Sequence, residues 1–184
     1  MSYDIQKEEQ RSESLDGQTA VIAKPRLTAQ AVQIVALVGI AVTAPLLQMQ
    51  VLTGPLVNAT LFIAVVMVGW KKAFVVALFP SLISLAVGLL PAVLAPMVPF
   101  IILSNMILIL LFDLWRKKSY WLSIGVASVV KFIFLYVASL LVIKLWVAQP
   151  VATKLASMMS WPQLITALAG GVIAYVFLKA VKRV

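Results

Sequence analysis

The stretch PAVLAPMVPFIILSNMILILLFDLWRKK, residues 91–118, decides how the rest of this chain is interpreted. Three prolines stand in its first nine residues, and an apolar run with Ser104 and Asn105 in its middle follows them. The basic residues Arg116, Lys117 and Lys118 close it. An apolar run of about 20 residues that ends in positive charges is typical of a membrane-spanning helix. The stretch therefore predicts a span with an irregular entry, a polar residue at depth and a basic anchor.

The composition of the whole chain agrees with a membrane environment. Of 184 residues, 63% are hydrophobic and 11% are charged, and the mean hydropathy is +1.08. A soluble domain of this size could not bury so much apolar surface. The net charge of +9 would suggest nucleic acid as a partner of a soluble protein. Here the basic residues mostly separate apolar runs, which is the pattern of membrane topology, so we expect no nucleic acid partner.

The residue types that carry most enzyme chemistry are missing. The chain has no cysteine and no histidine, and five of its six acidic residues lie in the first 16 positions. This excludes disulfides, thiol nucleophiles and metal sites built from Cys or His. Asp113 alone could supply a carboxylate in the membrane portion, and it adjoins a basic cluster. No Walker A motif is present. We therefore expect no catalytic residue, no metal and no cofactor, and a protein that is not an enzyme.

The charged residues divide the chain into a tail and six predicted helices. Residues 1–26 are polar and predict a cytoplasmic, disordered tail, and they lack the pattern of a signal peptide. Residues 27–184 predict an all-α membrane domain. Its uncharged runs are long enough for two spans each at about 20 residues a crossing. Four of the predicted helices are 28–47, 55–70, 120–146 and 161–179, and residues 149–160 form a polar connection before the last. The other two lie in the uncharged run 73–112, one on each side of a division at residues 88–99.

The distribution of Lys and Arg predicts the topology. With six spans, twelve basic residues fall on one side of the membrane and two, Lys144 and Lys154, fall on the other. Such an excess marks the cytoplasmic side, so both termini are expected in the cytoplasm and the protein in the cell membrane as a multi-pass protein. The twelve are Lys7, Arg11, Lys24, Arg26, Lys71, Lys72, Arg116, Lys117, Lys118, Lys179, Lys182 and Arg183.

Lys131 lies near the middle of the predicted helix 120–146, where a charge costs about 2.5–3.5 kcal/mol on insertion scales. Its neighbours one turn away are Ala127, Ser128 and Leu135, a face partly made of small residues. One interpretation is that its ammonium pairs with an anionic ligand. The other is that it snorkels to an interface or pairs with a carbonyl group.

Several amide side chains lie at mid-depth or toward the outer side. Asn105 is as deep as Lys131, whereas Asn58 and Gln163 fall in the first turns of their predicted helices, and Gln48 and Gln50 precede Asn58. Any single intramembrane amide is explained by a hydrogen bond between helices. Together they predict an outward-open cavity with amides and one cation.

Trp161 belongs to the outer aromatic belt by default, with ligand stacking as the alternative because Gln163 is close by. One face of the helix before the division at residues 88–99 consists of small residues, Ala77, Ser81, Ser84 and Gly88. Close helix packing in lipid explains that face. One face of the last predicted helix carries Gln163, Ala167, Gly170 and Ala174.

In length, six spans, cytoplasmic termini and outward polar residues, the chain resembles the substrate-binding S components of energy-coupling factor (ECF) transporters. The segments 53–58 (TGPLVN), 94–99 (LAPMVP) and 160–163 (SWPQ) are similar to the branch of that family whose substrates are uncharacterised. The resemblance implies a subunit that captures a vitamin-like or organic-acid micronutrient outside the cell. It also implies three partners, a transmembrane coupling protein and two cytoplasmic ATPase subunits, and a transfer step in which the subunit topples in the membrane.

One feature of that family is not matched. Its first helix often carries Ala-x-x-x-Ala toward the coupling protein, and here the nearest equivalent is Gly39 with Thr43, beside Ala36. The resemblance implies that these three residues dock the partner. The alternative function is a non-transporting membrane scaffold like the cell-shape protein MreD. A scaffold predicts that Lys131 and Asn105 face other helices and enclose no cavity. A membrane enzyme or redox anchor is the weakest of the alternatives.

Overall fold

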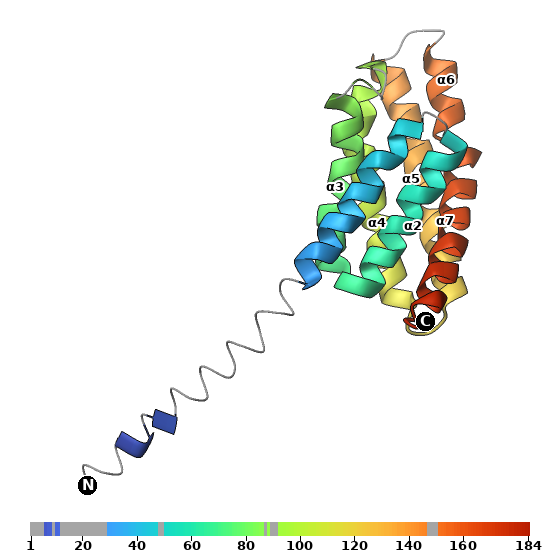
Figure 1. The fold of residues 1–184 in the computed structure, drawn as a ribbon. Coiled ribbons are helices and arrows are strands. Elements are labelled where there is room, and N and C mark those ends of the chain that lie inside the picture. Colours follow the sequence, from blue (N-terminus) through green and yellow to red (C-terminus); the bar gives the residue numbers. More distant parts are fainter. Residues whose placement is uncertain are drawn as a thin grey trace.

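The computed structural model is a bundle of helices that run side by side (Figure 1). It describes residues 6–8, 10–11, 29–47, 50–86, 88, 92–146 and 151–184, and no strand occurs among them. Most of the predicted tail, residues 1–26, lies outside these residues, and so does Gln48. The first helix of the bundle covers residues 29–43 and continues into a 3-10 turn, η1 (Ala44–Leu47). The elements that follow are α2 (Gln50–Val68), α3 (Trp70–Ala86), η2 (Ala92–Met97), α4 (Val98–Trp115), α5 (Tyr120–Trp146), α6 (Val151–Met158) and α7 (Trp161–Ala180).

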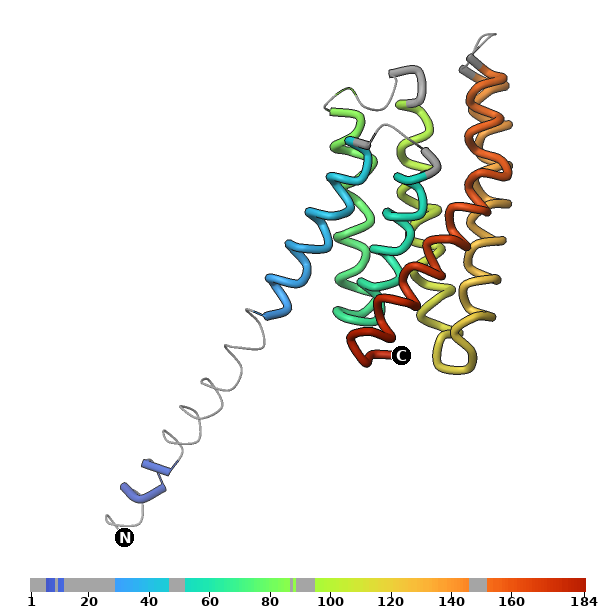
Figure 2. The backbone as a smooth tube through the Cα atoms, turned by 45° about the vertical axis from the view of Figure 1, so that its right-hand side comes forward, coloured from blue at the N-terminus to red at the C-terminus, as the bar shows by residue number. Residues whose placement is uncertain are grey.

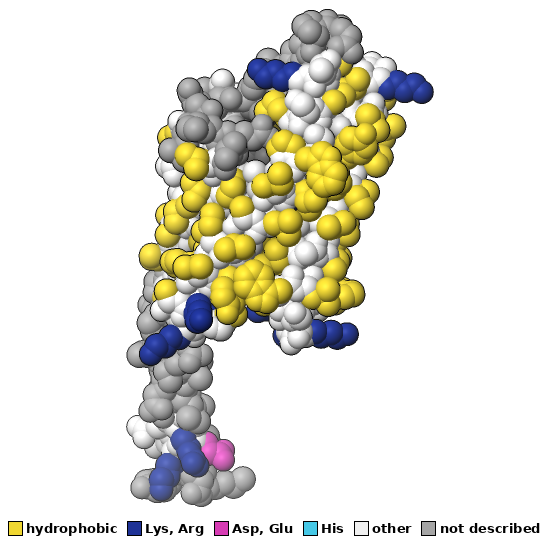
Figure 3. Space-filling model, turned by 90° about the vertical axis from the view of Figure 1, so that its right-hand side faces the viewer, with side chains coloured by type: hydrophobic (Ala, Val, Ile, Leu, Met, Phe, Trp, Pro, Cys, Tyr) yellow, Lys and Arg dark blue, Asp and Glu magenta, His cyan; other side chains and the backbone are white. Residues whose placement is uncertain are grey.

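Four of these helices are long and apolar enough to cross a membrane. They are Ala29–Leu46, Ala95–Trp115, Tyr120–Leu145 and Ala152–Ala180, and Leu52–Val68 is a shorter apolar helix. The predicted all-helical membrane fold is therefore confirmed at this level. On the face of the bundle drawn in Figure 3, apolar side chains are spread over the middle and Lys and Arg side chains lie at the two ends, as suits a helix bundle in lipid.

The two ends of the bundle differ in charge. At one end α2 turns into α3, α4 turns into α5, and the chain terminates after α7 (Figures 1 and 2). We call this the basic end, because eight basic residues of the described bundle lie on these turns and the C-terminal segment: Lys71, Lys72, Arg116, Lys117, Lys118, Lys179, Lys182 and Arg183. The opposite end has Lys144 near the end of α5 and Lys154 in α6.

Helix α2 is central and the helix over residues 29–43 is peripheral. α2 packs against α3, α4 and α7, and α5 packs against α4 and α7. Only 17% of the residues in Ala29–Leu46 are buried, against 39% in Ala95–Trp115 and in Tyr120–Leu145. Lys72 donates a side-chain hydrogen bond to Gln30 and so ties the start of the first helix to α3.

The core consists of two apolar clusters stacked along the bundle. One lies toward the basic end and draws on the first helix, α2, α3, α4, α5 and α7, with Phe62, Leu108 and Phe112 among its completely buried members. The Phe62 and Phe112 rings meet edge to face at 4.7 Å between centroids. The other lies toward the opposite end and contains Met97, Leu135, Ala138, Val142, Leu155 and Met159.

Two predicted boundaries differ from the structure. The helix expected to begin at Pro55 begins at Gln50, so Pro55 lies inside α2 and not in its first turn. Because proline has no backbone N–H, Pro55 predicts the first turn of a helix. A proline can also lie inside a membrane helix when other groups satisfy the carbonyl that loses its hydrogen bond. The segment 149–160, expected as a polar connection, contains the helix α6. Its buried Ala152, Leu155 and Met159 recur at helical spacing, while Lys154 and Ser157 stay exposed.

Candidate functional site: a lysine held by two asparagines

The most unusual feature of the interior is a cluster of three polar side chains from three helices, which we call the polar triad: Asn58, Asn105 and Lys131. The Lys131 Nζ donates to Asn58 Oδ1 at 2.6 Å and to Asn105 Oδ1 at 2.7 Å. Lys131 is 3% exposed and each asparagine is 2% exposed. Because α2, α4 and α5 each supply one member, the triad joins three helices at one level of the bundle.

The triad lies between the two apolar clusters. On α5, Ala127 precedes Lys131 and belongs to the cluster toward the basic end, whereas Leu135 follows it and belongs to the other. Ala127, Lys131 and Leu135 face the same buried side of α5 because each is one turn from the next. The ammonium is thus surrounded by apolar layers above and below, which makes every one of its polar contacts costly to lose.

Asn58 is fixed from two further directions. Its Nδ2 donates to the Gly54 carbonyl oxygen at 2.9 Å, one turn earlier in α2. Its Cβ lies against α7, where a Cβ placed on Gly170 would come within 2.7 Å of it and within 2.8 Å of the Pro55 oxygen. Only a glycine at position 170 lets the two backbones approach this closely.

A second close approach lies one turn away in the same pair of helices. A Cβ on Gly54 would come within 2.7 Å of the Thr166 Cβ. Gly54 and Asn58 on α2 therefore meet Thr166 and Gly170 on α7 as two contacts four residues apart. Sequence reasoning found the small face of α7 but not its partner. Gly54, one turn before Asn58, was the available signal on α2, since small residues let membrane helices approach closely.

No acidic side chain of the described residues pairs with the triad. Asp113 is the only acidic side chain after residue 16. It lies eight residues beyond Asn105 on α4, about 12 Å along the helix axis, and pairs with Arg116 at 2.9 Å. Amide oxygens supply dipoles and no net charge, so a protonated Lys131 has no counter-charge among the described residues around it.

One hydroxyl near the triad is unsatisfied. Ser128 lies one turn before Lys131 on the buried side of α5, and its Oγ is buried without a hydrogen-bond partner among the described residues. The neighbouring buried serine of α4 differs, since Ser104 Oγ donates to the Ile101 oxygen at 2.7 Å. A buried polar atom without a partner costs about 1–3 kcal/mol, so Ser128 calls for an explanation.

The five residues predicted to bind substrate do not all come together. Asn58, Asn105 and Lys131 form the triad. Asn58 is the ninth residue of α2 and so lies deeper than the first-turn position predicted for it, because α2 starts before Pro55.

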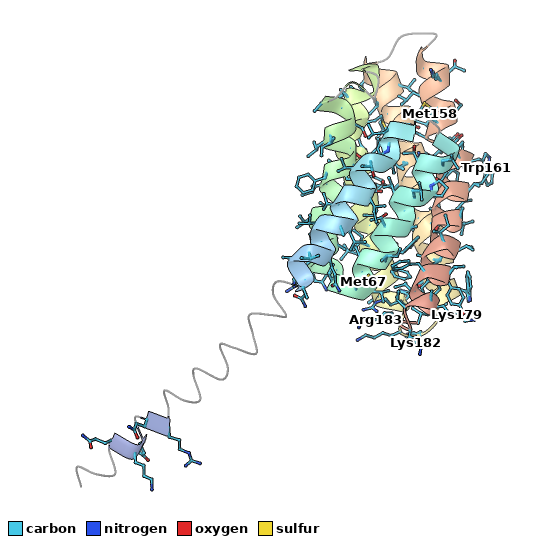
Figure 4. The ribbon with its side chains drawn as sticks, in the orientation of Figure 1. Met67, Met158, Trp161, Lys179, Lys182 and Arg183 are labelled. Atoms are coloured by element: carbon cyan, nitrogen blue, oxygen red, sulfur yellow. The ribbon has the colours of Figure 1, made fainter. Side chains whose placement is uncertain are left out.

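Trp161 and Gln163 lie elsewhere. The Trp161 side chain is 66% exposed and stacks on Phe132, with centroids 5.4 Å apart, and it points outward from α7 in Figure 4. Gln163 Nε2 donates to the Met158 oxygen at 3.2 Å and joins α7 to α6. Both side chains have structural contacts that explain them without a ligand.

The residues predicted for partner docking share one exposed surface. Ala36, Gly39 and Thr43 are all exposed on the first helix. A Cβ on Gly39 would meet no atom within 4 Å, and Thr43 Oγ1 donates back to the Gly39 oxygen at 2.9 Å. This surface lies on the least buried helix and is open to another molecule or to lipid.

Comparison of the chain with protein-family models, with curated proteins and with solved structures found no match. The interpretation of the triad therefore depends on its own geometry and charge.

The contact between Gly170 and Asn58 can be tested by adding one methyl group. We expect Gly170→Ala to lower the midpoint of thermal unfolding in detergent, because the new Cβ must displace Asn58 and the α2 backbone. Overpacking of this kind costs about 1–3 kcal/mol. The matched control is Gly125→Ala on α5, where a Cβ meets nothing within 4 Å. Equal melting temperatures for the two variants would show that α7 does not hold Asn58 in place.

Proposed function

We propose that this protein captures a small anionic solute in the membrane and passes it to other subunits of a multi-part importer. The observation that carries the proposal is the buried Lys131 side chain, whose Nζ is held by two amide oxygens and has no carboxylate partner among the described residues. A structural cross-link between helices would gain most from an acidic partner, because an ion pair lowers the cost of burying both charges. Two asparagines instead orient the ammonium and leave its charge available.

The proposed topology follows from the charged ends. Six helical segments cross the membrane, with α6 and α7 together as the last crossing, and the basic end with both termini faces the cytoplasm. Lys144 and Lys154 then face outward. Solute enters from the outer side and pairs with Lys131 near mid-membrane. The apolar cluster toward the outer side lies between the triad and that side, and it includes Met97, Leu135 and Leu155. Entry of the solute therefore requires α6 and η2 to move.

Transport needs a source of energy that this chain does not supply. The chain has no Walker A motif, so ATP hydrolysis falls to partner subunits. In the ECF arrangement that the sequence resembles, the partners are a transmembrane coupling protein and two cytoplasmic ATPases. The exposed surface of Ala36, Gly39 and Thr43 is the proposed docking face for the coupling protein, because small side chains let a partner helix come close.

A scaffold function remains the second candidate, and one observation favours it. Lys131 on α5 bonds to Asn58 on α2 and to Asn105 on α4, as a purely structural junction of three helices would. The two candidates differ in whether the charge of Lys131 matters or only its length and hydrogen bonds.

The topology can be tested by single-cysteine labelling, because the chain has no native cysteine. We expect Ser157→Cys, in α6, to react with a membrane-impermeant maleimide in intact cells. Val184→Cys, at the basic end, should react only after the membrane is permeabilised. The reverse pattern, or labelling of both from one side without permeabilisation, would contradict the proposed orientation and span number.

The anion site can be tested by a substitution that neutralises charge without changing shape. Asn105→Asp keeps an oxygen acceptor beside Lys131 and adds a negative charge. In a thermal-shift screen against water-soluble vitamins and small organic acids, we expect an anionic compound to stabilise the wild type. Asn105→Asp and Lys131→Met should each weaken its binding at least about tenfold, as loss of one charged contact does.

Ligand affinity, with stability as the check on folding, separates the two candidates. Asn105→Asp should melt no lower than the wild type, because the new ion pair satisfies Lys131. Retained ligand affinity in this variant would contradict the anion site. A screen without any stabilising compound, together with no coupling protein in native purifications, would favour the scaffold.

A further inference from the structure

The unsatisfied hydroxyl of Ser128 narrows the class of solute. Ser128 is completely buried and its Oγ has no hydrogen-bond partner among the described residues. The other buried serine hydroxyls of α5 donate to backbone oxygens: Ser123 to Tyr120 at 2.6 Å and Ser139 to Tyr136 at 2.7 Å. A serine in a membrane helix ordinarily satisfies itself in this way. Ser128 does not, and it is the one adjacent to Lys131.

Helix geometry brings the two side chains to the same place. Ser128 and Lys131 are three residues apart, so their Cβ atoms are about 5–6 Å apart on one face. A helical side chain leans back over the turn that precedes its own Cα. The long Lys131 side chain therefore extends along the Ser128 turn. The Lys131 Nζ donates to Asn58 and Asn105, and a protonated amine has a third N–H for a ligand on the same face of α5 as Ser128.

We propose that Lys131 and Ser128 together bind the carboxylate group of a small monocarboxylic acid with an apolar body. Each oxygen of a carboxylate accepts hydrogen bonds, so one can accept from the ammonium and the other from the hydroxyl. A single positive charge matches a monoanion, whereas a phosphate dianion would leave a buried negative charge unpaired. The neighbouring buried side chains on α4 and α5 are apolar, among them Leu108, Ala127 and Leu135, which suits a solute with an apolar body. This proposal rests on the proposed function and specifies the ligand of the same site.

The test uses benzoate and hexanoate as probes, with benzamide and hexanamide as neutral controls of the same shape. Binding to the purified full-length protein in detergent is measured by calorimetry. We expect both acids to bind at least tenfold more tightly than their amides, and inorganic phosphate not to bind. The expected effect of Ser128→Ala is a roughly tenfold loss of affinity for the acids with little change for the amides, as for one hydrogen bond to a charged group.

Ser139→Ala is the matched control, because Ser139 is equally buried on the same helix but already bonded to Tyr136. It should leave the affinity for the acids unchanged. Without ligand, Ser128→Ala should melt at or above the wild-type temperature, because it removes an unpaired polar atom and breaks no bond. A clear drop in the melting temperature would mean that the hydroxyl has a structural partner and would overturn the proposal.

The outcomes separate this proposal from the proposed function. If the acids bind and Lys131→Met abolishes binding but Ser128→Ala does not change it, the anion site stands and the role of Ser128 is wrong. If phosphate or another anion binds through Lys131 and the acids do not, capture of an anion stands and the carboxylate class is wrong. If neither acid nor any other anion binds, both proposals fail.

Discussion

A lysine side chain in the interior of the helix bundle, with no acidic partner among the described residues, is the constraint on which the rest of this structure depends. Burying a charge costs several kcal/mol even after the surroundings relax, and Asp113 is both distant and engaged with Arg116. Lys131 is retained by two short hydrogen bonds to Asn58 and Asn105. These bonds require α2, α4 and α5 to present one residue each at the same depth. The apolar clusters on either side supply no further polar group.

The packing of α7 serves the same arrangement. Gly170 lets α7 contact α2 directly behind Asn58, and Gly54 does the same against Thr166. Asn58 is thereby held by its bond to the Gly54 oxygen, by α7 and by Lys131. Such rigid support is what a binding site needs, since donors held in place lose little entropy when a ligand arrives. It is also what a structural junction needs, and the charge of Lys131 is the property that distinguishes the two functions.

Sequence reasoning predicted the fold well where charge and hydropathy determine it. The bounds of α5 follow from the basic residues before Tyr120 and the end of the apolar run at Trp146. Lys131 and Asn105 were expected at one depth, and they meet. Reasoning failed where packing overrides local signals: Pro55 lies inside α2, Asn58 is deeper than predicted, and α6 forms in a segment that looked like a connection because its buried side chains cover the cluster at that end. Proximity to Gln163 in sequence also gave no information about Trp161, which stacks on Phe132 at the lipid-facing surface.

The central claim is that Lys131 carries an unneutralised charge that is held by Asn58 and Asn105 and is available to an anion. Nuclear magnetic resonance of the protein with ¹⁵N-labelled lysines in a lipid nanodisc tests it most directly. The Nζ signal of Lys131 is assigned by its loss in Lys131→Met, and the exposed Lys144 and Lys154 serve as internal references. The account predicts ammonium protons at Lys131 that exchange slowly with water, and a signal that shifts when benzoate is added. A Lys131 signal that exchanges as fast as those of Lys144 and Lys154, and does not respond to any anion, would contradict it.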